Sequence, residues 1–263
     1  MTRGRLMIGA ICAFAAGGVL MGSAGEQAAR SGPAPTGSGR VVELFNGRDL
    51  AGWKVVPFFR TTADPNQWKA VGAAAMSPAN ERLLRLEPGR GVLSNGEGKT
   101  SSLVSEFEHG DALLHIEFMI PRGGNSGVYL QGLYEVQIID SHGSGRTERR
   151  SGDVGGLYGR WRNEQTYEGH APLVDASKAA GEWQSFDIVF RAPRFDATGK
   201  KTQNARFVFV AHNGQVIHQD AEVTGGTREA MERPESPKGP LMLQGDHGPV
   251  AYRNIKVIPL SLN

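Results

Sequence analysis

Cysteine is nearly absent from this sequence. Its only cysteine, Cys12, lies in the apolar run Leu6–Met21, which follows two arginines and precedes the small residues Gly22-Ser23-Ala24. A short basic start, an apolar core and small residues at the end are typical of a secretory signal peptide. We therefore predict a signal peptide over residues 1–24, cleaved near Ala24, with a retained membrane anchor as the alternative. The mature chain would contain no disulfide, so packing alone would stabilise it.

A net charge of either sign is also absent once the signal is removed. The signal takes two of the 29 basic residues, which leaves 27 basic residues against 27 acidic ones. Proteins that bind nucleic acid present a basic patch or stripe, and none is visible in this sequence. We expect no nucleic-acid partner and, after signal cleavage, no membrane contact. The predicted destination is the periplasm or the extracellular space, and nothing in the sequence indicates an oligomeric state.

Long segments with the 3.6-residue period of an amphipathic helix are a third absence. The chain instead contains about a dozen short alternating segments separated by turn residues, among them the hairpin signal His212-Asn213-Gly214. Many short strands with frequent turns are typical of an all-β, two-sheet sandwich. Residues 25–39 are small, polar and proline-containing, so they predict a flexible linker before a folded domain over residues 40–263.

The most informative stretch runs from Leu113 to His142. In its first strand apolar residues alternate with His115 and Glu117, and in its last strand they alternate with Glu135 and Gln137. Neighbouring side chains on a strand point to opposite faces of the sheet. We therefore predict one sheet packed on one side, with carboxylates, amides and a histidine together on its other face. A merely solvated polar face is the alternative.

Several short motifs follow one another along the chain. They are Leu44–Trp53, Glu117-Phe118, Gly124–Leu130, Tyr134–Ile138 with Asp140, Gly181–Trp183, Leu243-Gln244, Asp246–Gly248 and Arg253–Ile255. In order and spacing they resemble the 3-keto-disaccharide hydrolase family over residues 42–260. Gly245 is a departure, because it lengthens by one residue the Leu-Gln-Asp-His sequence that is common in this family.

The resemblance implies a concanavalin-like, antiparallel jelly roll with long loops around a concave, sugar-sized groove. It also implies cleavage of glycosides or disaccharides oxidised at C3, so a small carbohydrate is the expected partner. A ketone at C3 acidifies the C2 proton, and removal of that proton lets the group on C1 leave, after which water adds. Such a site needs a base near C2, donors at the C3 oxygen and an acid at the leaving oxygen. Direct displacement by water stays open as an alternative.

Motif membership and strand face select the candidate residues. Glu135 and His247 are the predicted catalytic base and acid, in either order. Asn125, Gln137 and Arg253 are predicted to donate hydrogen bonds to the substrate. The other predicted substrate-binding residues are Glu117, Tyr129, Asp140, Gln244 and Asp246. We find no zinc spacing and no run of calcium ligands, so no cofactor is predicted, while a requirement for a divalent metal stays open.

A retaining glycosidase is one alternative function. Glu135, Gln137 and Asp140 resemble in spacing the acidic strand of laminarinase-type enzymes, in which two carboxylates flank the bond that is cleaved. Glu135 and Asp140 lie five positions apart, so a bulge would be needed to bring them to the same face of a strand.

A non-catalytic carbohydrate-binding module is the other alternative, because a concave polar sheet can bind sugar without a catalytic acid. Tyr129, Tyr158 and Trp161 would then serve as platforms for sugar rings. Purely structural roles are also open for single residues. Glu117 would pair with an arginine on the sheet surface, and Asp140 would cap a turn.

Overall fold

The computed structural model describes residues 39–57 and 66–262. Within these ranges the chain forms strands and connecting loops, and no helix that could cross a membrane is found there. The predicted signal peptide and, except for Gly39, the predicted linker lie outside the described residues.

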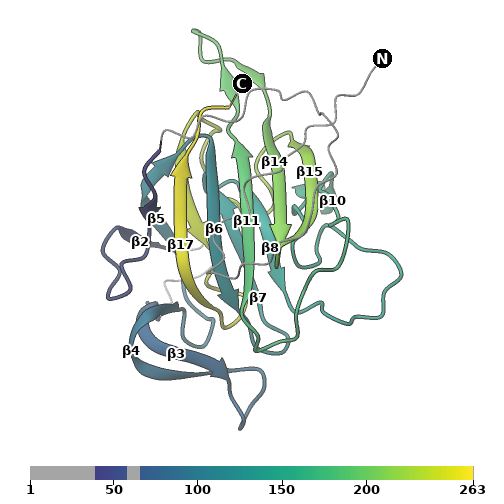
Figure 1. Cartoon of the computed structure of the whole chain (residues 1–263). Helices are drawn as coiled ribbons and strands as arrows, with labels where there is room; N and C mark the ends of the chain where they lie inside the picture. The colour runs from purple at the N-terminus through teal and green to yellow at the C-terminus, as the bar shows by residue number, and fades with distance from the viewer. Residues whose placement is uncertain (1–38, 58–65, 263) are drawn as a thin grey trace, which may run out of the picture.

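Two antiparallel sheets form the body of the domain (Figure 1). The eight-stranded sheet has the order β15-β14-β11-β6-β17-β4-β3, with β1 beside β17. Its strands are β1 (Val42–Glu43), β3 (Lys69–Met76), β4 (Leu84–Ser94), β6 (Ala112–Met119), β11 (Gln184–Arg191), β14 (Ala205–His212), β15 (Gln215–Val223) and β17 (Ala251–Pro259).

The five-stranded sheet has the order β2-β5-β16-β7-β8. Its strands are β2 (Trp53–Val56), β5 (Ser102–His109), β7 (Asn125–Leu130), β8 (Tyr134–Ile139) and β16 (Gly239–Leu243). Two small hairpins stand apart from both sheets: β9 (Arg160–Arg162) with β10 (Gln165–Tyr167), and β12 (Arg194–Phe195) with β13 (Lys201–Gln203). In Figure 1 the eight-stranded sheet faces the viewer and β5, β7 and β8 lie behind it.

The hydrophobic core fills the space between the two sheets. Alternate residues of each strand point inward, as the two-residue period of a strand requires. Across the core, the ring of Phe190 from β11 lies 5.5 Å from the ring of Tyr134 from β8. The hydroxyl of Tyr252 from β17 shares a 2.8 Å hydrogen bond with the hydroxyl of Ser126 from β7. This is the two-sheet, antiparallel jelly-roll sandwich that the sequence predicts.

The chain crosses from one sheet to the other inside the stretch from residue 113 to residue 142. β6 lies within the eight-stranded sheet, whereas β7 and β8 lie at one edge of the five-stranded sheet. Their apolar faces meet in the core, so their polar faces point to opposite sides of the molecule. The prediction that His115, Glu117, Glu135 and Gln137 share one polar face is therefore wrong. Alternation is a local property, whereas membership of a sheet depends on pairing with strands far away in the sequence.

Candidate active site

The outer face of the five-stranded sheet carries a group of polar side chains. Val128 of β7 and Val136 of β8 are buried in the core, so alternation places Tyr129, Glu135 and Gln137 on the outer face. Tyr129 lies opposite Glu135 in the β7–β8 pairing. Two loops bring charged residues close enough to act on these side chains. We call the whole group the outer-face cluster: Tyr129, Glu135, Gln137, Arg228, Glu229, Asp246 and His247.

Glu135 is the most deeply buried acid of the outer-face cluster, with only 3% of its surface exposed. Burial raises the pKa of its carboxyl group to about 8; the charges of Glu229 and Asp246 act in the same direction, and the phenol of Tyr129 opposes them. Glu135 is therefore mostly protonated at pH 7 and has a proton to give. Gly127 makes room for it, because a Cβ atom at this position would collide with the Glu135 carboxyl group.

Polar side-chain atoms are buried on this face. Oε1 of Gln137 and Oδ1 of Asn125, which begins β7, have no hydrogen-bond partner among the described residues, and the phenol of Tyr129 shares a hydrogen bond with the Glu135 carboxyl group. Burial raises the pKa of Tyr129 well above its usual range, so the phenol stays protonated and remains a donor. A buried polar atom without a partner costs about 1–3 kcal/mol. Buried atoms of this kind leave hydrogen-bonding capacity for a polar ligand on this face.

Asp246 and His247 form a second proton-transfer unit in the loop after β16. Oδ1 of Asp246 lies 2.8 Å from Nδ1 of His247. This hydrogen bond raises the pKa of His247, and the negative charges of Asp246 and Glu229 add to the effect. A histidine whose basicity is raised and whose ring is oriented by a carboxylate suits proton transfer. The side chain of His247 is 41% exposed, so a substrate can reach it.

Asn95 holds the loop that carries this pair. Its buried side chain donates hydrogen bonds to the carbonyl oxygens of Gly245 at 3.0 Å and Gly248 at 2.9 Å, and accepts one from the amide of Val250 at 2.8 Å. Gly245, the extra residue of the motif, is packed so tightly that a Cβ atom there would collide with the backbone of Ser101. The sequence analysis did not identify Asn95, because its partners lie 150 or more positions away.

The loop between β15 and β16 contributes Arg228 and Glu229, which the sequence analysis also missed. Nε of Arg228 lies 3.1 Å from Oε1 of Glu229. Glu229 has a φ of 64°, a left-handed conformation that residues other than glycine seldom adopt and that is often found at functional sites. Thr227 ties the loop to the sheet, since its hydroxyl accepts a 3.3 Å hydrogen bond from the amide of Glu135. The only signal in the sequence is the length of this loop, which the structure places at residues 224–238.

Glu117 and Arg253 lie on the outer face of the eight-stranded sheet, with the core between them and Glu135. They are opposite each other in the β6–β17 pairing, and Nε of Arg253 donates a 2.6 Å hydrogen bond to Oε2 of Glu117. The side-chain amide of Asn254 donates another, also 2.6 Å long, to Oε1 of Glu117. The structure therefore does not place Glu117 and Arg253 with the other predicted site residues. It shows instead the surface ion pair that was the alternative for Glu117.

Asp140 and Gln244 lie at strand ends of the five-stranded sheet, and each forms a hydrogen bond with the protein backbone. Oδ2 of Asp140 accepts a 2.8 Å hydrogen bond from the amide of Gly123, so this carboxylate caps the turn between β6 and β7. β8 pairs with β7 without a bulge, so nothing aligns Asp140 with Glu135 in the manner of a laminarinase-type pair. Gln244 follows β16, is buried, and donates its backbone amide to the carbonyl of Gly127 at 3.0 Å.

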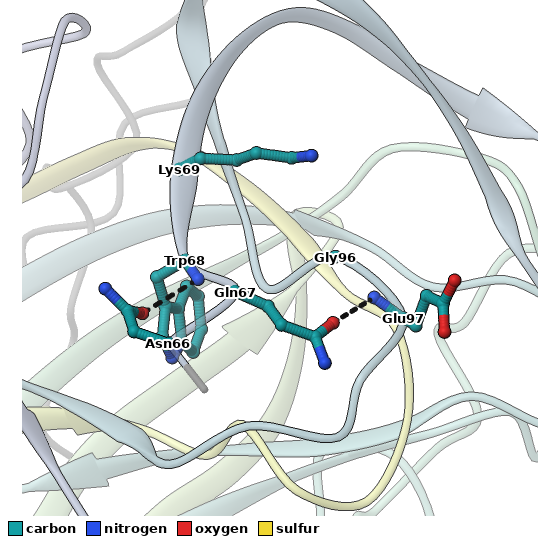
Figure 2. A pocket seen from close by; sticks show the side chains of 6 residues that line it. All are labelled: Asn66, Gln67, Trp68, Lys69, Gly96 and Glu97. Carbon is teal, nitrogen blue, oxygen red and sulfur yellow. Dashed lines mark hydrogen bonds between the residues drawn. The ribbon is translucent and has the colours of Figure 1, made fainter. Parts of the chain in front are cut away.

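A separate hollow of about 510 Å³ lies at the start of β3 (Figure 2). Its lining residues are Asn66, Gln67, Trp68, Lys69, Gly96 and Glu97. Turn contacts occupy its amide groups, since Oε1 of Gln67 accepts a 2.9 Å hydrogen bond from the amide of Glu97. Its lining residues include one acid, Glu97, and no histidine, so it has no acid–histidine pair like Asp246 and His247. Over residues 39–57 and 66–262, no group of three or more His, Cys, Asp or Glu side chains could hold a metal ion.

The outer face of the five-stranded sheet thus carries two proton-transfer units, Glu135 and the Asp246–His247 pair. The chain belongs to the family described as the 3-keto-alpha-glucoside-1,2-lyase-like domain, which matches residues 40–258. This match confirms the family resemblance seen in the sequence motifs.

Solved structures of two provisionally assigned glycosyl hydrolases from Parabacteroides distasonis are similar to this chain. The first has 25% sequence identity and a TM-score of 0.58, and the match covers 89% of this chain and 94% of the other. The second has 18% sequence identity and a TM-score of 0.53, and the match covers 84% of this chain and 94% of the other. This second similarity shows a shared fold. No curated protein matches the chain.

Proposed function

We propose that this protein cleaves 3-keto-α-glucosides by elimination across C1 and C2 of the oxidised sugar. The observation that carries the proposal is the buried, protonated Glu135 on the same face as the Asp246–His247 pair. One unit can give a proton while the other takes one, which is the requirement of an elimination. The family description refers to the same class of glucoside and to a 1,2-lyase.

In the proposed reaction His247 removes the proton from C2. The electron pair of the C2–H bond forms an enolate that extends to the C3 oxygen. When the C3 carbonyl re-forms, a C1=C2 double bond is made, the bond from C1 to the glycosidic oxygen breaks, and that oxygen takes the proton of Glu135. The products are the free aglycone and a 1,2-unsaturated 3-keto sugar. Water then attacks C1: its hydroxyl group bonds to C1, its remaining proton goes to Glu135, and His247 returns a proton to C2, which gives 3-keto-glucose.

The assignment of base and acid follows from the surroundings of the two groups. Glu135 is held protonated by burial, so it can act as an acid at neutral pH. The hydrogen bond with Asp246 raises the pKa of His247, which makes its neutral imidazole a stronger base. Asp246 is thus a positioning residue, because it acts on the substrate through His247.

Charge develops at the C3 oxygen as the enolate forms, and the outer-face cluster has donors for it. The phenol of Tyr129 is buried and stays protonated, and it shares a hydrogen bond with the Glu135 carboxyl group. The guanidinium of Arg228 lies in the same cluster and acts electrostatically on His247. Donors that are already fixed in a site shielded from water stabilise a developing oxyanion more strongly than water does.

The test compares 3-keto-trehalose and 3-keto-sucrose with the unoxidised sugars, using the full chain in D₂O. We expect cleavage of only the keto-sugars, with deuterium incorporated at C2 of the released 3-keto-glucose above the level of an enzyme-free control. Glu135→Gln and His247→Gln should each reduce kcat by about 10²-fold or more. Glu117→Gln, on the other sheet, is the matched control and should keep its activity. Cleavage of both sugar types without deuterium at C2 would refute the elimination.

A retaining glycosidase is the second candidate, because Glu229 supplies a second carboxylate that acts on the pKa of Glu135. In that mechanism Glu229 would attack C1 and Glu135 would protonate the leaving oxygen. Aryl glucosides without a ketone would then be substrates, and azide would restore activity to Glu229→Ala. Sugar binding with no cleavage of any substrate would instead indicate a carbohydrate-binding module.

A further inference from the structure

Trp161 is the only aromatic residue among the large, exposed hydrophobic residues of the described chain. It is 41% exposed and lies in the short strand β9 of the β9–β10 hairpin. A tryptophan presents a large, rigid apolar face together with a polar N–H group, which suits contact with a ligand. In a sugar-binding site, an aromatic face of this kind packs against the C–H groups of a sugar ring.

The hairpin directs Trp161 to one side. Its neighbours Arg160 and Arg162 point to the other side, as strand alternation requires, and their guanidinium groups lie 5.2 and 4.7 Å from the centre of the Tyr167 ring. Trp161 is left to face the loop between β15 and β16. There the guanidinium of Arg228 lies 3.9 Å from the centre of its ring.

The same arginine joins Trp161 to the outer-face cluster. Arg228 contacts Glu229 through its side chain and donates its backbone amide to the carbonyl of Gly159, next to β9, at 2.8 Å. Glu229 in turn acts electrostatically on both Glu135 and His247. Trp161 is therefore fixed at the rim of the outer-face cluster. It contacts Arg228, and Arg228 contacts Glu229, whose charge acts on Glu135 and His247.

We infer that Trp161 is the platform for the aglycone ring, so that the substrate is a disaccharide or another glycoside whose aglycone is a sugar ring. This inference rests on the proposed function, because it assigns the leaving half of the same substrate. Arg228 holds the indole in place, and the aglycone ring stacks on the indole surface that stays exposed. A glycoside with a very small aglycone does not reach this platform.

The first test uses steady-state kinetics with 3-keto-trehalose and with methyl 3-keto-α-glucoside. Trp161→Ala should raise KM for the disaccharide about five- to tenfold and leave kcat and the methyl glucoside unchanged, in line with the strength of aromatic stacking. Trp161→Phe should recover most of the loss. Trp183→Ala is the matched control, since Trp183 also stacks with an arginine, Arg253 at 4.1 Å, but on the other sheet. Equal effects on both substrates would overturn the inference.

A binding measurement separates this inference from the proposed function. Unoxidised trehalose should shift the indole N–H resonance of Trp161, and this binding should be lost in Trp161→Ala and kept in Trp183→Ala. If no keto-sugar is cleaved but trehalose still binds through Trp161, the platform is supported and the proposed elimination is wrong. If keto-sugars are cleaved but Trp161→Ala changes neither KM nor trehalose binding, the elimination stands and the platform is refuted.

Discussion

Replacing Glu135 with glutamine should make the protein more stable as well as inactive. The carboxyl group has an ordinary pKa of 4.5 and a pKa of about 8 in the folded protein. Because the pKa is higher in the folded protein, the contribution of this carboxyl group to the free energy of unfolding is fully present below pH 4.5 and is lost as the pH rises through 8. At pH 7, folding must keep protonated a group that ionises in the unfolded chain, which costs about 3 kcal/mol.

Glutamine has nearly the same shape and does not titrate, so the variant avoids this cost. The gain in unfolding free energy should be near zero at pH 4.5, about 3 kcal/mol at pH 7 and about 5 kcal/mol above pH 8. For a domain of this size, the gain at pH 7 corresponds to a rise in Tm of about 6–12 °C. An active-site group that is held in a costly protonation state commonly gives such a trade-off between stability and activity.

The assay is denaturant unfolding of both proteins at pH 5, 7 and 9, followed by tryptophan fluorescence. Glu106→Gln is the control, since the Glu106 side chain is 53% exposed and its replacement should change stability little at any of these pH values. A Glu135→Gln variant whose stability equals that of the wild type at all three pH values would refute the conclusion that Glu135 is buried and protonated.

Three further predictions concern the neighbourhood of the site and the core. Asn95→Ala should lower activity at least tenfold and lower the free energy of unfolding by about 1–3 kcal/mol. It should also move the pKa of His247, measured by NMR, toward 6.5. An unchanged pKa would contradict the role of Asn95 in positioning the His247 loop. Gly127→Ala should displace the Glu135 carboxyl group and lower both kcat and Tm, and unchanged kcat would count against the proposed contact. His218 is buried with a pKa lowered to about 4, so its stabilising contribution should be lost as the pH falls from 6.5 to 4. The test uses Glu135→Gln as the parent protein, because titration of Glu135 changes stability in the opposite direction over the same pH range. In this parent, adding His218→Gln should reduce the loss of unfolding free energy between pH 6.5 and pH 4. An unchanged loss would show that His218 does not cause it.

Several features of the fold could be predicted from the sequence because they depend on neighbouring residues. Alternation of apolar and polar residues predicted strands in the regions of β6 and β8. The Asn213-Gly214 pair predicted the turn between β14 and β15, and both residues adopt positive φ values of 50° and 79°. A series of short strands with frequent turns was enough to predict a two-sheet sandwich.

The candidate site could be predicted only in part. Asn125, Tyr129, Glu135 and Gln137 lie on one face because they belong to two strands joined by a short turn. Asp246 and His247 follow β16, which pairs with β7, so they also come near. The assignment of Glu117 and Arg253 to the same face was wrong, because alternation within β6 does not reveal which sheet β6 joins.

The sequence by itself thus determined the strands, the turns and the family, all of which are encoded in short stretches of the chain. Only the tertiary structure decided which polar residues come together, because that depends on pairings and loop contacts between distant parts of the chain. Asn95 binds the His247 loop 150 positions away, and the charge of Glu229 acts on Glu135 only because the fold brings the loop after β15 near the sheet. The raised pKa of Glu135 has the same origin, since a carboxyl group loses its water only when the whole fold surrounds it.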